Sequence, residues 1–222
     1  MNRKKDVLFI FIGFFGALAG CFAVIMFNKY IMMSIPLIGR MICMLLTYWL
    51  IALVPIVLMC ISKEKIDSLK IPKEKIGIQI LLGIIGGLLL ASAYFLVPFF
   101  LGFGSFVDNG RRYSRLFQFA FELLYFTVSV GAVEEIVFRG FIYDKLKKAC
   151  ENEWVAIIIS SVLFGLFHTI NGNIIQVCLT AIIGFIFCII RYKVKHFSII
   201  SLILMHGIYD FMLTLYSSLL IR

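Results

Sequence analysis

The sequence predicts an all-α polytopic membrane protein, because hydrophobic residues dominate it and gather in long runs. They make up 62% of the 222 positions, and the mean hydropathy of +1.05 is far above that of a soluble domain. About seven transmembrane helices are expected from runs that can cross a hydrocarbon core of ~30 Å, although six to eight helices fit the same pattern. The runs lie near residues 7–26, 41–61, 77–102, 117–140, 154–170, 174–190 and 198–221.

The first run allows two interpretations. Three basic residues precede it, and Leu18-Ala19-Gly20-Cys21 is similar to the end of a lipoprotein signal peptide. After Cys21, however, the chain stays apolar for six more residues instead of turning polar. This continuation favours an uncleaved first membrane helix.

The positions of the basic residues predict the topology. Seven spans that start from a cytoplasmic N-terminus place 15 of the 21 Lys and Arg residues on the cytoplasmic side, five of them in the charged loop 62–75. Cytoplasmic loops of membrane proteins carry such an excess. We therefore expect a multi-pass protein of the cell membrane with its N-terminus in the cytoplasm. The net charge of +9 follows from this topology, and no nucleic-acid partner is expected.

The middle of the chain contains features of packing and anchoring. Gly83, Gly86 and Gly87 allow a close helix approach in the third span. The basic cluster Arg111-Arg112-Arg115 lies on the outer side, where we expect it to contact lipid headgroups and to reach Glu122. No linker or repeat divides the chain, so residues 1–222 are expected to form a single membrane-embedded domain. The first three spans then form a scaffold for a core over about 117–221.

Two adjacent carboxylates stand inside an apolar run of that core. A charged side chain at the centre of a membrane helix costs roughly 2.5–3.5 kcal/mol on insertion scales, so it usually marks a pathway or a reactive site. Glu135 and Arg139 are four residues apart and can form an ion pair on one helix face. Glu134 points about 100° away from Glu135, so it can face a different neighbour.

A helical hairpin would bring Glu134 close to a histidine. The polar turn 149–153 joins the fourth and fifth runs, and Glu134 and His168 lie 17 residues on either side of its centre. Both would then lie at the same depth, roughly 25 Å of helix from the turn. Phe164 precedes His168 by one turn and would pack against its ring. His206 lies 11 residues after Lys195 and can share this layer.

A second histidine has an acidic neighbour one turn away. His206 and Asp210 share a helix face, so the acid can orient the imidazole or both can bind a metal. A single histidine or ion pair in a membrane helix commonly serves packing alone. A reactive or ion-handling site is indicated by the occurrence of six such residues together, namely Glu134, Glu135, Arg139, His168, His206 and Asp210.

Three motifs in these runs are similar to those of one protein family. EEIVFR at 134–139 resembles the EExxxR motif of the CAAX prenyl protease and bacteriocin-processing (CPBP or Abi) family of intramembrane endopeptidases. FGLFH at 164–168 resembles its FxxxH motif, and HGIYD at 206–210 resembles its HxxxN/D motif. The resemblance covers about 130–215 and concerns the first three spans little.

The resemblance implies roles for the six residues. Glu134 and His168 would activate a water molecule, and His206 with Asp210 would stabilise the oxyanion. Glu135 and Arg139 would support the motif helix. Family members are described as metalloproteases or as glutamate-type proteases, so a divalent metal such as zinc remains open, with His168, His206, Asp210 and Glu134 as its ligands. Many members have Asn where this chain has Asp210, and an ionised Asp cannot donate to an oxyanion.

The resemblance also implies a substrate class. The expected partners are the lipid bilayer and a peptide or protein substrate in the membrane, such as the precursor of a secreted peptide. The chain is short and rich in Ile, Phe and Lys, so it looks more like a bacterial member of the plasma membrane than like the eukaryotic branch. Two other functions stay open, a non-catalytic adaptor or bacteriocin self-immunity protein and a proton-coupled transporter. The lack of an internal inverted repeat counts against the transporter.

Overall fold

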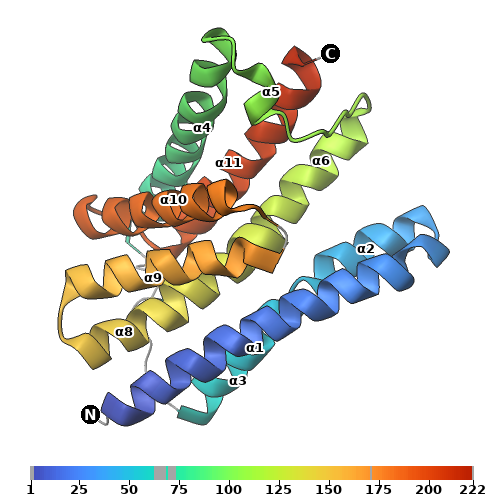
Figure 1. Ribbon diagram of the computed structural model, residues 1–222. Coiled ribbons are helices and arrows are strands. Elements are labelled where there is room, and N and C mark those ends of the chain that lie inside the picture. The colour runs from blue at the N-terminus through green and yellow to red at the C-terminus, as the bar shows by residue number, and fades with distance from the viewer. Residues whose placement is uncertain (1–2, 63–68, 70–73, 171, 222) are drawn as a thin grey trace. The chain divides into compact units, whose positions relative to one another are not determined.

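The computed structural model confirms an all-α polytopic membrane protein (Figure 1). It describes residues 3–62, 69, 74–170 and 172–221. The chain is 88% helical, and these described ranges contain no strand. Seven helices within them are long and apolar enough to cross a membrane, and they coincide with the seven runs expected from the sequence. Most of the charged loop 62–75 lies outside the described residues.

The first three spans contain one interruption that the hydrophobic pattern does not predict. The second span stops and restarts at Tyr48 and Trp49, where the backbone forms a turn between two helices. The elements of this part are α1 (Arg3–Tyr30), the 3₁₀ turn η1 (Met32–Ser34), α2 (Leu37–Thr47), α3 (Leu50–Ser62), α4 (Ile76–Phe100) and α5 (Gly104–Val107).

The fourth span changes its helical type twice and contains the EEIVFR motif. Its elements are α6 (Leu116–Tyr125), the π-helix η3 (Phe126–Gly131), α7 (Ala132–Glu135), the π-helix η4 (Ile136–Ile142) and α8 (Tyr143–Cys150). The two carboxylates therefore lie on a single α-helical turn between two π-helical segments. Such segments are rare and occur frequently at functional sites.

Two of the last three spans begin at a capping side chain, and the third follows a short loop. They are α9 (Glu153–Phe167), which continues into the 3₁₀ turn η5 (His168–Ile170), α10 (Ile174–Lys193) and α11 (Ile199–Leu220). Asn152 caps α9, where its side chain accepts from the backbone N–H groups of Trp154 and Val155. Asn173 caps α10 in the same way. A capping side chain satisfies backbone donors that have no partner in the first turn.

The helices form two compact units. The first contains residues 1–71 and 133–199, and the second contains residues 72–132 and 200–222. The motifs at 134–139 and 164–168 lie in the first unit, and the motif at 206–210 lies in the second. The expectation of a single domain over 1–222 with a core over about 117–221 stays a prediction.

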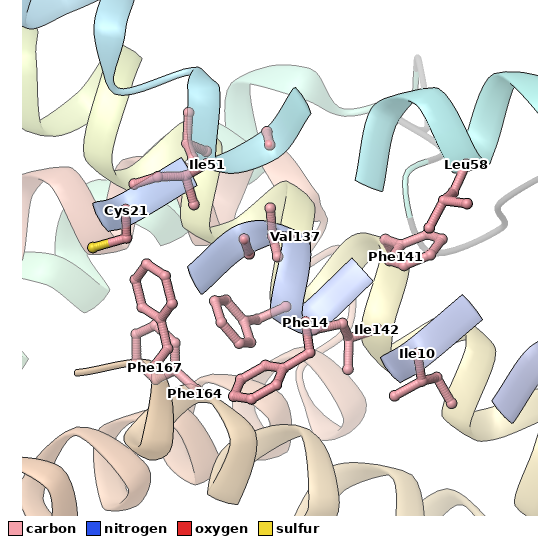
Figure 2. Close-up of a cluster of buried hydrophobic side chains, with 14 of the residues drawn as sticks. Ile10, Phe14, Cys21, Ile51, Leu58, Val137, Phe141, Ile142, Phe164 and Phe167 are labelled. Atoms are coloured by element: carbon pink, nitrogen blue, oxygen red, sulfur yellow. The ribbon is translucent and has the colours of Figure 1, made fainter. Parts of the chain in front are cut away.

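The first unit has a core of interlocking apolar side chains (Figure 2). Phe14 of α1, Ile51 of α3, Val137 and Phe141 of η4 and Phe164 of α9 are all buried in it. Burying such side chains and the close van der Waals contact between them stabilise a helix bundle. The segments α7, η4 and α8 of the fourth span, here called the motif helix, contain the EEIVFR motif. The core therefore holds the motif helix against both α1 and α9.

Glycines bring α1 close to its neighbours in this unit. A Cβ atom at Gly20 would lie 2.4 Å from the backbone oxygen of Leu50, at the start of α3. A Cβ at Gly16 would meet the side chain of Val54 at 2.5 Å, and one at Gly13 would meet Phe141 at 2.4 Å. Only residues without a side chain permit these approaches. One face of α1 thus fixes both the interrupted second span and the motif helix.

Glycines also bring helices close together in the second unit, as the glycines of the third span predict. A Cβ at Gly83 of α4 would lie 2.6 Å from the backbone oxygen of Ser201 of α11, and one at Gly87 would lie 2.7 Å from that of Met205. Gly207 of α11 approaches the backbone of Thr127 in η3 just as closely. Helices α4 and α11 and the segment η3 therefore pack backbone to backbone.

A polar loop joins α5 to α6 in the second unit. Arg112 donates to both carboxylate oxygens of Asp108, at 2.9 and 2.8 Å, and Ser217 of α11 donates to the same carboxylate at 2.6 Å. Arg111 pairs with the buried Glu122 at 2.9 Å, which confirms the expected contact. The hydrogen bonds from Arg112 and Ser217 hold the pKa of Asp108 well below its usual range.

The close approach at Gly20 can be tested through stability. We expect Gly20→Ala to lower the free energy of unfolding by about 1–3 kcal/mol, because an added methyl group forces the backbone of α3 away. Gly77→Ala is the control, since a Cβ at Gly77 meets nothing within 4 Å. Thermal unfolding in detergent measures both. Equal melting temperatures for the two variants would contradict the packing described for α1.

The network at Asp108 predicts a pH-dependent loss of stability. Because its folded-state pKa is depressed, Asp108 stabilises the fold fully above its unfolded pKa of about 3.9 and loses this contribution as the pH falls towards the folded value. The melting temperature of Asp108→Asn should therefore lie below that of the wild type by a constant amount between pH 5 and 7, and the difference should shrink below about pH 4. A difference that grows with acidity would contradict this network.

Candidate active site

The motif helix buries three charged side chains in the first unit. Glu134 is 2% exposed, Glu135 is fully buried and Arg139 is 1% exposed. Burying charge without compensation is unfavourable by several kcal/mol for each ion, so each of these groups needs close polar or aromatic neighbours. The neighbours of Glu134 differ from those of Glu135 and Arg139, as the 100° offset between the two carboxylates predicts.

Glu135 and Arg139 form the expected ion pair. Nη1 of Arg139 lies 2.9 Å from Oε1 of Glu135, and the guanidinium lies 4.0 Å from the ring centre of Phe164. The ring of Phe187 lies on another side at 5.3 Å. A cation above an aromatic face is stabilised by the ring quadrupole. The pair thus connects the motif helix with α9 and α10.

Helix α10 closes around this ion pair. A Cβ at Gly184 would lie 3.2 Å from Nη2 of Arg139 and 3.0 Å from the ring of Phe164, so the glycine makes room for the guanidinium. Arg191, seven residues further along α10, donates from Nη1 to the backbone oxygen of Arg139 at 2.9 Å. That carbonyl lies in the π-helical segment η4, where the ordinary α-helical hydrogen-bond pattern is changed.

Glu134 lies between a tyrosine and a histidine. The hydroxyl of Tyr48 donates to Oε1 of Glu134 at 2.5 Å, and Nε2 of His168 lies 3.9 Å from Oε2. The approach of His168 to Glu134 is the one that the hairpin geometry predicts. Tyr48 was missed, because it belongs to a span that the sequence assigned to the scaffold. A hydroxyl in the middle of an apolar run was the only signal.

His168 is held in one orientation at the end of α9. Its Nδ1 lies 2.9 Å from the backbone oxygen of Phe164, and the rings of Phe164 and Phe167 meet it edge to face at 4.9 and 5.4 Å. A carbonyl oxygen can only accept, so Nδ1 carries a proton, and Nε2 is an acceptor whenever the ring is neutral. Nε2 is the nitrogen that faces the carboxylate of Glu134.

His206 and Asp210 lie together on α11 in the second unit. Nε2 of His206 is 3.4 Å from Oδ2 of Asp210, and the ring is 6% exposed. The carboxylate is close enough to orient the imidazole, as their spacing predicts. The expectation that His206 shares a layer with Glu134 and His168 stays a prediction. Across the described ranges, no group of three His, Cys, Asp or Glu side chains gathers where it could hold a metal ion.

A second buried ion pair in the first unit was also missed. Nζ of Lys145 in α8 lies 2.9 Å from Oδ1 of Asp6 in α1, and both side chains are buried. Asp6 stands in the charged start of the chain and Lys145 among the basic residues that the topology assigns to the cytoplasmic side, so neither pattern indicates a contact between them. The pair joins α1 to the end of the motif helix.

The clasp formed by Glu135 and Arg139 can be tested by protein accumulation. Arg139→Ala leaves a buried carboxylate uncompensated, and we expect it to destabilise the fold by about 3–5 kcal/mol. Lys147→Ala is the control, because Lys147 forms an exposed ion pair with Glu153 at 2.8 Å and such pairs contribute about 0–1 kcal/mol. Membrane protein yield and melting temperature in detergent measure both effects.

The double variant Glu135→Gln, Arg139→Gln separates loss of charge balance from loss of contact. It removes both charges, so it should accumulate better than Arg139→Ala. Normal accumulation of Arg139→Ala would contradict the clasp.

Comparison with known proteins finds a family model that is similar to the motif-bearing segment. Residues 116–212 match the family model described as type II CAAX prenyl endopeptidase Rce1-like. No curated protein and no solved structure matches the chain. The matched segment contains all three motifs, and the family implies CAAX-type intramembrane protease activity on a membrane-associated peptide. The match over residues 116–212 therefore agrees with the resemblance of the three motifs to the CAAX prenyl protease and bacteriocin-processing family, in a chain that is a multi-pass membrane protein.

Proposed function

We propose that the protein is an intramembrane endopeptidase that hydrolyses a peptide bond with a water molecule activated by Glu134 and His168. One observation carries the proposal, which is the buried carboxylate of Glu134 facing the acceptor nitrogen of His168 at 3.9 Å. The separation is too long for a direct hydrogen bond. It suits two groups that bind the same water molecule.

The tautomer of His168 supports this arrangement. A water molecule about 2.8 Å from both Oε2 of Glu134 and Nε2 of His168 would direct its two O–H bonds roughly 90° apart, close to its natural angle. Both neighbours would then accept, so the lone pairs of the water oxygen would point away towards a substrate carbonyl. A carboxylate within hydrogen-bonding reach of the proton that it removes is the arrangement a general base needs.

The hydrolysis balances with these groups. Glu134 takes one proton from the water while the oxygen of that water forms a bond to the scissile carbonyl carbon, which leaves a tetrahedral oxyanion. Glu134 then returns the proton to the amide nitrogen as the C–N bond breaks, and the products are a carboxylic acid and an amine. The family resemblance assigns stabilisation of the oxyanion to His206 and Asp210, whose side chains lie 3.4 Å apart in the second unit.

A metal-dependent route would use the same residues. Glu134, His168, His206 and Asp210 are all of types that bind zinc, so this route is the second candidate. No step of the proposed reaction is assigned to a metal.

The substrate is proposed from the family and the membrane setting. The family implies a membrane-associated peptide, and we propose that the physiological substrate is the precursor of a secreted peptide. The excess of basic residues on the side of the N-terminus supports a cytoplasmic N-terminus, and we propose a bacterial plasma membrane as its location. The site would then be reached from the cytoplasmic side.

The variant Glu134→Gln tests the proposed function directly. The amide has the same shape and cannot take a proton, so we expect cleavage to fall by about 10²–10⁴-fold with normal accumulation. Glu151→Gln is the control, because that side chain is exposed at the end of α8. Purified proteins in detergent are assayed with a peptide library that includes a prenylated CAAX peptide.

Two outcomes of this assay would contradict the proposal. Full cleavage by Glu134→Gln would show that Glu134 is not the general base. Loss of wild-type cleavage with a chelator, restored by zinc, would replace the metal-free reaction with one in which these side chains bind a metal.

A further inference from the structure

We propose that Tyr48 is a positioning residue for the catalytic carboxylate and fixes which oxygen of Glu134 faces His168. This inference rests on the proposed function and adds a residue that lies outside the three motifs. The hydroxyl of Tyr48 donates to Oε1 at 2.5 Å, while Oε2 of the same carboxylate faces Nε2 of His168 at 3.9 Å. The two oxygens therefore have different neighbours.

Tyr48 reaches Glu134 because the second span is interrupted there. Helix α2 ends at Thr47 and α3 begins at Leu50. Across the interruption, the backbone N–H of Ile51 donates to the oxygen of Tyr48 at 3.2 Å and that of Ala52 to the oxygen of Trp49 at 3.0 Å. These bonds span three residues rather than four, so the turn is tighter than an α-helix and its side chains leave the regular helical positions.

The interruption is held close to the motif helix by α1. Gly20 of α1 lies against the backbone of Leu50 and Ile51, two and three residues after Tyr48, while Gly13 of the same helix lies against Phe141 of the motif helix. The ring of Tyr48 packs partly buried against the core of the first unit. The phenol is therefore placed by rigid neighbours on both sides, and a donor placed in this way loses little conformational entropy when it binds the carboxylate.

A fixed donor has a specific consequence for a carboxylate. The torsion about the last bond of Glu is broad and twofold, so without a partner the two oxygens exchange places easily. A hydrogen bond to an ionised carboxylate is about twice as strong as one between neutral groups. The phenol would thus hold the carboxylate plane so that Oε2 stays directed at the water shared with His168.

The same hydrogen bond also joins the second span to the motif helix, so a purely structural role has to be separated from positioning. A structural role predicts lower stability and an unchanged reaction in the molecules that remain folded. Positioning predicts a slower chemical step, an unchanged KM and a changed pH dependence, because the donor stabilises the ionised form that takes the proton.

The variant Tyr48→Phe removes only the hydroxyl. We expect kcat to fall roughly 10- to 100-fold with KM unchanged, and the acidic half-maximum of kcat to move to higher pH. The matched control is Tyr143→Phe. Tyr143 is partly buried against the same core, and the hydrogen bonds recorded for the described residues include none from its hydroxyl. This control should keep the wild-type kcat and pH profile.

A second substitution keeps the ring and the hydroxyl. Incorporation of 3,5-difluorotyrosine at position 48 makes the phenol a stronger donor, and the acidic half-maximum of kcat should move to lower pH, opposite to its movement in Tyr48→Phe. Because the shape of the side chain is nearly kept, this measurement does not depend on whether Tyr48→Phe folds well.

The assay includes the wild type and Glu134→Gln so that the two proposals fail separately. One outcome overturns the positioning role and leaves the proposed function standing. In it, the wild type cleaves and Glu134→Gln does not, while both changes at position 48 leave kcat and the pH profile as in the wild type. If Tyr48→Phe loses melting temperature alone, the bond is structural and the inference is again overturned. Full cleavage by Glu134→Gln would overturn both. The inference is supported if the acidic half-maximum of kcat moves to higher pH in Tyr48→Phe and to lower pH with 3,5-difluorotyrosine at position 48.

Discussion

The structure of the first unit depends on placing charged side chains inside an apolar bundle without leaving them uncompensated. Glu135 and Arg139 meet at 2.9 Å with both side chains buried, and the guanidinium is further stabilised by the rings of Phe164 and Phe187. Since ions are expensive to bury, the helices that supply these neighbours are constrained to stay in place. Compensating the pair therefore also fixes α9, and with it His168 at its end. Glu134 is left to face Tyr48 and His168, because Arg139 pairs with the neighbouring Glu135.

The helical irregularities of the chain occur where this placement requires them. The π-helical segments η3 and η4 border the turn that contains both carboxylates, the 3₁₀ turn η5 begins at His168, and the second span is interrupted at Tyr48. Each departure from the α-helix redirects side chains that regular spacing would place elsewhere. Regular helices form the packing surfaces, through the glycines of α1 and α4, and the irregular turns orient the polar groups.

The sequence predicts a large part of this arrangement, because the relevant signals are local or follow helical spacing. Seven apolar runs give the seven spans, and the four-residue separation of Glu135 and Arg139 gives their ion pair. The equal distances of Glu134 and His168 from one turn give their approach.

Tyr48 and the pair Asp6–Lys145 could not be found in this way. Their contacts join residues 86 and 139 positions apart, and they depend on the close approach of α1 to α3 and α8. The π-helical segments leave no mark in a hydrophobic pattern. The roles of the six motif residues stay a prediction from the family resemblance.

The central claim is that Glu134 and His168 act on one water molecule, and a double-mutant cycle tests it most directly. The kcat/KM values of Glu134→Gln, His168→Gln and the double variant are compared with that of the wild type in detergent. If both groups hold the same water, the loss in the double variant should be close to that of the slower single variant, because the second change removes a function that is already lost. Losses that multiply would show that the two side chains contribute independently, and that result would contradict the account.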